Sequence, residues 1–97
     1  MNVRYHKCVQ RDVNEIRDHY VCESGPERAD EFFDELRKAI RLAALDPMRF
    51  HTAEGGLRRA NLKRFPYHFL YRIRPGYIRI SVVKHHKRHP SFGLRRK

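Results

Sequence analysis

Apolar residues recur along the first part of the chain with two different periods. In NVRYHK, residues 2–7, Val3 and Tyr5 fall on one face and polar residues on the other, which predicts a short strand with one buried face. The apolar residues that follow recur at intervals of three and four, a spacing typical of an amphipathic helix over residues 9–22.

A second helix is expected after the sequence ESGPE. Gly25 ends the first helix and Pro26 suits the first turn of the next, while Ser24 and Glu27 also match a capping box, so the first helical residue stays open. The pattern ends at about Leu45, and the two helices are therefore expected to form an antiparallel hairpin. The expected buried stripe, with Phe32 on its flank, consists of Ala29, Phe33, Leu36, Ile40 and Ala43.

Three strand-like segments fill most of the remaining chain. Residues 57–63 are weakly patterned, residues 67–74 alternate well, and residues 77–85 follow a turn at Pro75–Gly76. The predicted apolar face consists of Tyr67, Phe69, Tyr71, Ile73, Ile78, Ile80 and Val82. The opposite face is expected to carry Arg59, His68, Arg72 and Arg79.

The order of these elements predicts the fold class. An N-terminal strand, a helical hairpin and a three-stranded antiparallel meander indicate an α+β fold with the helices packed on one face of the sheet. Residues 1–97 are short enough to form one domain, which is the expectation here. No run of apolar residues is long enough to span a membrane, so a cytoplasmic protein without membrane contact is expected.

Charge is distributed very unevenly along the chain. The formal net charge is +11, every acidic residue lies at or before Glu54, and the residues after it include 13 Lys or Arg. Such a concentration of one sign attracts polyanions, and arginine suits bidentate contacts with phosphate. Nucleic acid or a very acidic protein is therefore the expected kind of partner.

The two cysteines lie close in sequence to histidines, which raises the possibility of a zinc site. The four residues concerned are His6, Cys8, His19 and Cys22. A helix over residues 9–22 would separate its ends by about 21 Å, which neither one tetrahedral ion nor a disulfide can span. Two reduced, partly buried cysteines are expected, and no metal or cofactor.

Several segments together resemble the RelE/ParE superfamily of toxins from bacterial type II toxin–antitoxin modules. They are the helical hairpin, LRRANLKRFPYHFLYRI, and a last strand that ends in VVKHHKRHPSF; Phe65–Ile73 is the most specific part. The resemblance implies a growth inhibitor bound by a cognate antitoxin, which should be acidic. RelE-like members of the superfamily cleave messenger RNA on the ribosome, whereas ParE-like members poison DNA gyrase.

The first interpretation is ribosome-associated mRNA cleavage by an endoribonuclease. That reaction needs a base for the ribose hydroxyl, an acid for the leaving oxygen and cations around the phosphate. His85 and His86 are the candidate acid–base residues, with Arg88 beside them. The candidate residues for binding phosphate or nucleic acid are Arg58, Arg59, Lys63, Arg64, Arg72 and Lys87.

Other features of the chain depart from the ribonuclease pattern. No carboxylate follows Glu54, and Phe92 stands where some ribonuclease members use a tyrosine. The ending HHKRHPSF resembles ParE-like sequences more closely. A gyrase inhibitor without nuclease activity is therefore the alternative, and a non-catalytic RNA-binding module is the third. The last residues, Arg95, Arg96 and Lys97, are expected to form a mobile end.

Overall fold

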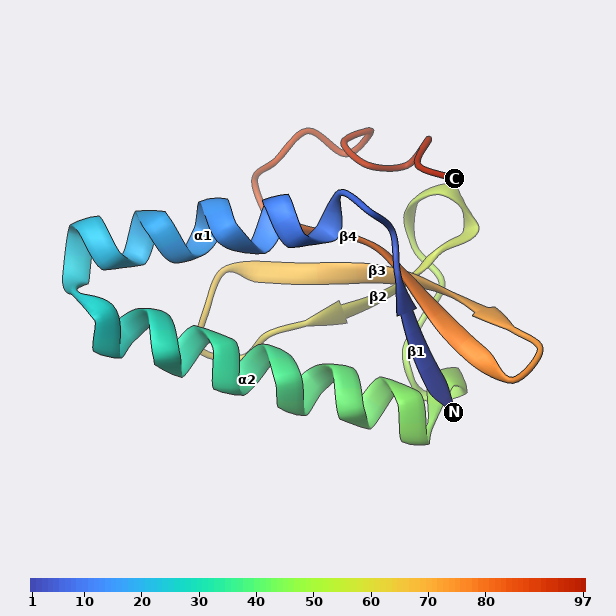
Figure 1. The fold of residues 1–97 in the computed structure, drawn as a ribbon. Coiled ribbons are helices and arrows are strands. Elements are labelled where there is room, and N and C mark those ends of the chain that lie inside the picture. Colours follow the sequence, from blue (N-terminus) through green and yellow to red (C-terminus); the bar gives the residue numbers. More distant parts are fainter.

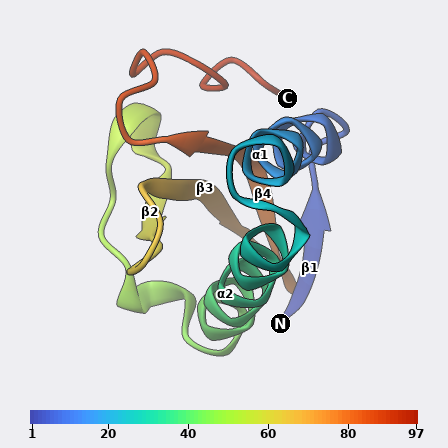
Figure 2. The same cartoon turned by 90° about the vertical axis from the view of Figure 1, so that its left-hand side faces the viewer.

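The computed structural model describes residues 1–97 and contains two long helices and a four-stranded sheet (Figure 1). The sheet order is β1-β4-β3-β2, with β1 parallel to β4 and the other neighbours antiparallel. Figure 2 shows both helices on the same side of β3 and β2, and the predicted α+β fold is confirmed. The elements are β1 (Asn2–Tyr5), α1 (Val9–Ser24), α2 (Pro26–Leu45), β2 (Arg58–Asn61), β3 (Tyr67–Arg74) and β4 (Tyr77–His85), with short 3-10 turns at Pro47–Arg49 and Glu54–Gly56.

The turn between the two helices depends on one glycine. Gly25 has a φ of 92°, a value that L side chains rarely adopt, and its N–H donates to the carbonyl of Val21 at 3.1 Å. Pro26 follows as the first residue of α2. The hairpin agrees with the expectation from sequence, except that α1 continues two residues further, to Ser24. Neither helix is long and apolar enough to cross a membrane.

The buried face of α2 differs from the predicted one. Phe32 is fully buried and packs against Phe65 and Tyr67, with ring centroids 5.5 Å away in each case, whereas Phe33 is only partly buried. Ile40 is also only partly buried, whereas Ala29, Leu36 and Ala43 are buried. The predicted stripe is therefore confirmed for these three residues, but the assignment of Phe32 to its flank is wrong. Either of the two adjacent phenylalanines could belong to the apolar stripe of the helix. Phe32 is the buried one because the aromatic residues of the sheet lie on its side.

A bulge in β4 changes the face of the sheet toward which the side chains of its last residues point. Leu70 pairs with Val82 but Tyr71 pairs with Ile80, which leaves Ser81 as an extra residue. Val83 therefore joins the core against the helices, and Val82 lies on the opposite face with Leu70. The prediction that Val82 continues the apolar face of Ile80 is wrong, because one inserted residue exchanges the two faces.

Two smaller expectations about the N-terminal region also fail. Tyr5 is 53% exposed, because the chain leaves the sheet at this point and His6 turns inward instead, with its Nδ1 accepting from the N–H of Cys8 at 3.0 Å. Cys8 is partly buried as expected, but Cys22 is exposed. The cysteines lie before the start and near the end of α1 and are both free thiols.

The C-terminal segment, residues 86–97, is packed against the molecule, so the expectation of a mobile end is wrong for Arg96, whereas Arg95 and Lys97 are exposed. Figure 2 shows it passing from the end of β4 toward α1. Phe92 and Leu94 cover a small apolar cluster on the face of the sheet opposite the helices. Arg96 forms an ion pair with Asp12 at 2.6 Å, and the two side chains are only 11% and 4% exposed.

Candidate functional site

The basic exit of β4 is a hydrogen-bonded turn. The N–H of His86 donates to the carbonyl of Pro66 at 2.9 Å, and the N–H of Arg88 donates to the carbonyl of His85 at 3.0 Å. The His85 Nδ1 accepts from the N–H of Lys87, also at 3.0 Å. The backbone of this exit is therefore held against the entry to β3, and the side chains start from defined positions.

His85 and His86 contact opposite faces of the sheet. The His85 ring packs edge-on against Tyr67, at 5.0 Å between centroids, on the side of the helices. The His86 ring stacks on His68, at 5.1 Å and 17° between planes. Consecutive residues at a strand end point in opposite directions, so the two rings have different neighbours although their centroids are only 6.4 Å apart.

His68 is the most deeply buried titratable residue on the face opposite the helices, and the sequence analysis did not assign it to the site. It is 2% exposed, its Nδ1 lies 2.9 Å from the His86 Nδ1, and its Nε2 has no hydrogen-bond partner. Burial, and then the charge of Arg59, lower the pKa of His68 to about 3. The signal available was its place in YHFLYRIR, one residue out of phase with the aromatic face.

Arg59 and Glu54 complete this group. One Arg59 nitrogen lies 3.3 Å from the His86 Nδ1, a second donates to Asn61 at 2.7 Å, and a third lies 3.5 Å from a Glu54 oxygen. Burial lowers the pKa of His86, and the charge of Arg59 lowers it further. The set Glu54, Arg59, His68 and His86 is called the histidine cluster below.

Lys84 lies beside the histidine cluster, but its side chain binds the C-terminal segment. It is 3% exposed, and its Nζ donates to the carbonyls of Pro90 at 3.0 Å and Phe92 at 3.1 Å. Burial lowers the Lys84 pKa. Sequence reasoning missed this residue too, because a lysine within an apolar strand resembles a solvent-facing residue.

The remaining predicted site residues are spread over the surface. Arg58 donates to the Phe50 carbonyl at 2.5 Å and supports the loop before β2, and Arg88 lies over the Phe92 ring at 4.0 Å. Lys87 is exposed. Arg72 is partly exposed on β3, at the far end of that strand from His68.

Lys63 and Arg64 form a turn that is fixed by α2. The backbone N–H groups of both residues donate to the carboxylate of Glu35, and the Arg64 side chain pairs with the same carboxylate at 3.3 Å. Of the nine predicted site residues, the structure therefore brings only Arg59 and His86 into direct contact across strands.

The histidine cluster is expected to make stability depend on pH. His68, with a folded pKa of about 3, stays neutral in the native state while the unfolded chain takes up a proton below about pH 6.5. The stability present above that pH is therefore lost as the pH falls toward 3, by at most about 1.4 kcal/mol per pH unit for one histidine. Urea unfolding between about pH 7.5 and about pH 5 measures the slope.

The variant H68Q removes this titrating group and should make the slope less steep, with the part due to His6 and His86, whose pKa values burial also lowers, remaining. H19Q, which changes an exposed histidine on α1, should retain the slope of the unchanged protein. Equal slopes in all three proteins would show that His68 does not control the acid sensitivity.

Similarity to known proteins agrees with this architecture. The chain is similar in structure to a chain of the chromosomal ParDE TA system from P. aeruginosa, with a TM-score of 0.78 and 23% sequence identity over 88% of this chain and 95% of that chain. The two chains therefore share the same fold. No curated protein matches the sequence.

The family model of the ParE toxin of the type II toxin–antitoxin system parDE matches residues 3–90. The chain belongs to this family of toxins. Membership implies a cognate antitoxin as partner, in agreement with the expectation from sequence, and assigns the chain to the ParE side of the broader RelE/ParE resemblance.

Proposed function

We propose that the protein inhibits growth by acting on DNA gyrase and that it does not cleave RNA. Membership in the ParE toxin family supports this proposal, because ParE-like members poison gyrase. The first interpretation from sequence, mRNA cleavage on the ribosome, depended instead on a pair of histidines acting together at the exit of β4.

The observation that carries the proposal is membership in the ParE toxin family, and the contacts of the two histidines agree with it. His85 contacts Tyr67 on the helix side, while His86 stacks on His68 on the other side. A general acid and a general base must both reach the atoms of one phosphodiester to cleave it. The two ring centroids lie 6.4 Å apart, but the His86 Nδ1 already contacts His68 at 2.9 Å and Arg59 at 3.3 Å, so His86 is not a free partner for His85.

The buried histidine of the cluster is also a poor base. A histidine with a pKa of about 3, such as His68, is a weak proton acceptor at neutral pH. One Glu54 oxygen lies 3.5 Å from Arg59 while the other is buried without a hydrogen-bond partner, and Phe92 offers no hydroxyl. The surroundings favour neutral imidazoles that pack and donate hydrogen bonds rather than transfer protons.

Two assays on the purified toxin test the proposal. Gyrase supercoiling of plasmid DNA should stop when toxin is added, while messenger RNA on translating ribosomes stays intact. Acid–base residues typically contribute about 10²–10⁴-fold each, so H85Q/H86Q would abolish a ribonuclease, whereas gyrase inhibition should persist in this variant. Ribosome-dependent RNA fragments that disappear in H85Q/H86Q, with gyrase unaffected, would overturn the proposal.

A further inference from the structure

Three arginines stand side by side across the sheet. In the strand register Arg4 of β1 is the partner of Arg79 of β4, and Arg79 is the partner of Arg72 of β3. Neighbouring strands lie about 4.8 Å apart, so the three residues form one straight line across three strands. Arg4, Arg79 and Arg72 are called the arginine row.

All three side chains project from the face opposite the helices. Ile78 and Ile73, which neighbour Arg79 and Arg72 along their strands, belong to the core against the helices. Because side chains alternate along a strand, the arginines point the other way. Arg4 is exposed, and Arg72 and Arg79 are partly exposed, so their guanidinium groups are available to a partner.

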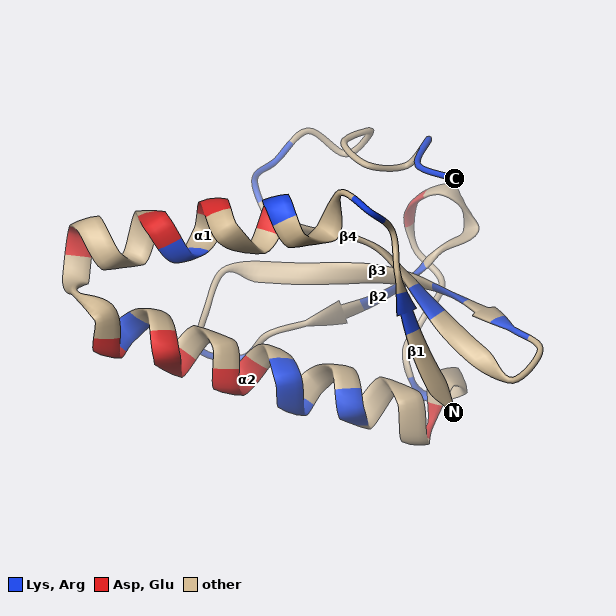
Figure 3. Cartoon of the chain, in the orientation of Figure 1, with Lys and Arg blue, Asp and Glu red and all other residues tan.

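No carboxylate in the molecule neutralises the arginine row. None of the three arginines takes part in an ion pair, and Glu54, the only acidic residue beyond Asp46, pairs with Arg59. Figure 3 shows the acidic residues concentrated on α1 and α2 and basic residues on β1 and the β3–β4 hairpin. Like charges directly opposite each other destabilise a sheet, and a bound anion would relieve this repulsion.

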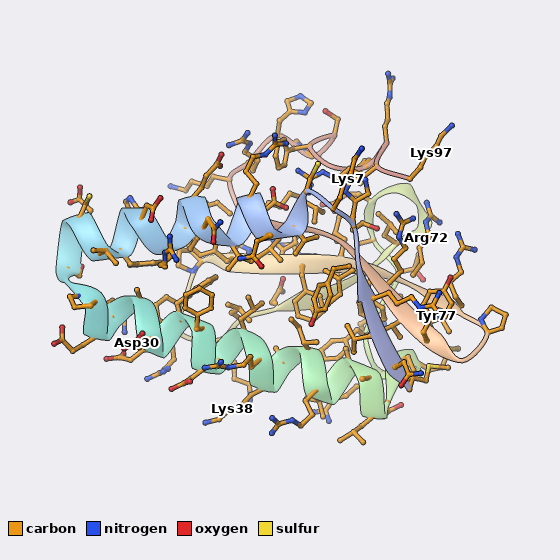
Figure 4. All side chains as sticks on the ribbon, viewed as in Figure 1. Lys7, Asp30, Lys38, Arg72, Tyr77 and Lys97 are labelled. Atoms are coloured by element: carbon orange, nitrogen blue, oxygen red, sulfur yellow. The ribbon has the colours of Figure 1, made fainter.

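The surroundings of the row are also basic and contain little apolar surface. Arg74 and Tyr77 are register partners at the end of the hairpin, and Figure 4 shows Tyr77 and Arg72 in this part of the molecule. The Arg4 guanidinium lies 4.2 Å from the centre of the Tyr77 ring and covers it. The patch therefore presents positive charge without a free aromatic or aliphatic anchor.

These features favour the phosphates of a nucleic acid over a protein partner. The centres of protein–protein interfaces are depleted in charge and depend on buried anchors, whereas interfaces with DNA are polar and strongly positive. Sites for single strands add aromatic side chains on which bases stack, and the row offers none that is free. Arginine forks match phosphate oxygens in a bidentate manner.

We infer that the arginine row binds the phosphodiester backbone of duplex DNA. The inference extends the proposed function, on which it rests: a toxin acting on gyrase contacts the DNA held by the enzyme as well as the enzyme itself. The row is held by three hydrogen-bonded strands, so its spacing is fixed before binding. No base contact is implied, and binding is independent of sequence.

Binding of a short fluorescein-labelled DNA duplex to the free toxin, without gyrase, tests the inference. Fluorescence anisotropy at several salt concentrations gives the affinity and its salt dependence. The variant R72Q/R79Q should bind more weakly, and the slope of log K against log salt should become less steep by about 0.9 for each phosphate that the variant no longer neutralises. R11Q/R41Q removes the same charge from exposed positions on the helices and should change the slope much less.

Three outcomes would overturn the inference. They are equal losses of affinity in R72Q/R79Q and R11Q/R41Q, unchanged DNA binding in R72Q/R79Q, and a preference of the row for single-stranded RNA or an acidic peptide over duplex DNA. Gyrase inhibition by the unchanged toxin is measured separately, so the inference can fail while the proposed function survives. Urea unfolding of R72Q/R79Q should show no loss of stability, because the substitution removes two like charges that face each other.

Discussion

The variant D12A is expected to lose about 3–5 kcal/mol of unfolding free energy, the usual effect of removing one partner of a buried ion pair. Asp12 accepts hydrogen bonds from Arg96 at 2.6 and 2.9 Å and from the N–H of Val83 at 3.2 Å. Arg96 also donates to the carbonyl of Ser81 at 3.1 Å, and its hydrogen bonds to Asp12 raise its pKa. The Asp12 carboxylate therefore connects α1, the last part of β4 and the C-terminal segment.

A second aspartate on the same helix provides the matched control. Asp18 pairs with Arg17 at 3.2 Å, but both side chains are largely exposed, and such pairs contribute about 0–1 kcal/mol. Urea unfolding of D12A and D18A gives the comparison. Similar small losses of stability in both variants would mean that the ion pair with Arg96 does not hold the C-terminal segment in solution.

The variant F32A is expected to cost about 3–5 kcal/mol, a large part of the stability of a small domain. Phe32 is fully buried and packs within 5.5–6.0 Å of the rings of Phe65, Tyr67 and Tyr20, so its removal leaves a cavity between α2 and the sheet. Urea unfolding measures the loss of stability.

The adjacent variant F33A is the control for this cavity. Phe33 is partly exposed at the edge of the core, so its truncation should cost clearly less than that of Phe32. A larger loss of stability for F33A would restore the helical phase expected from sequence and contradict the packing of α2 against the sheet aromatics.

The sequence by itself determined the elements and their order. The spacing of apolar residues in α1 and α2 is a local property, and so is the alternation in β3. Gly25 and Pro26 mark the boundary between the helices, because glycine suits a positive φ and proline suits the first turn of a helix. The segment FPYHFLYRI and the basic exit of β4 also carried the resemblance to the toxin superfamily, which membership in the ParE family makes specific. Such information lies within a few neighbouring residues.

Only the tertiary structure decided which faces these residues occupy. The bulge at Ser81 exchanged the faces of Val82 and Val83. The local sequence does not predict this extra residue, because a bulge is defined by the pairing of β4 with β3. The same register places His85 and His86 against different neighbours and buries His68. Pairing between distant strands therefore controlled the candidate site.

The two ends of the molecule illustrate the same division. The sequence showed that the residues after Glu54 are strongly basic, but Arg96 is used inside the protein, by Asp12, while Arg4 joins the row formed by Arg79 and Arg72. The composition gives the total charge of the chain but not the place of each charged side chain in the fold. The position of each charge depends on contacts between residues far apart in the chain, and these contacts separate the arginines that hold the fold from those free to bind a partner.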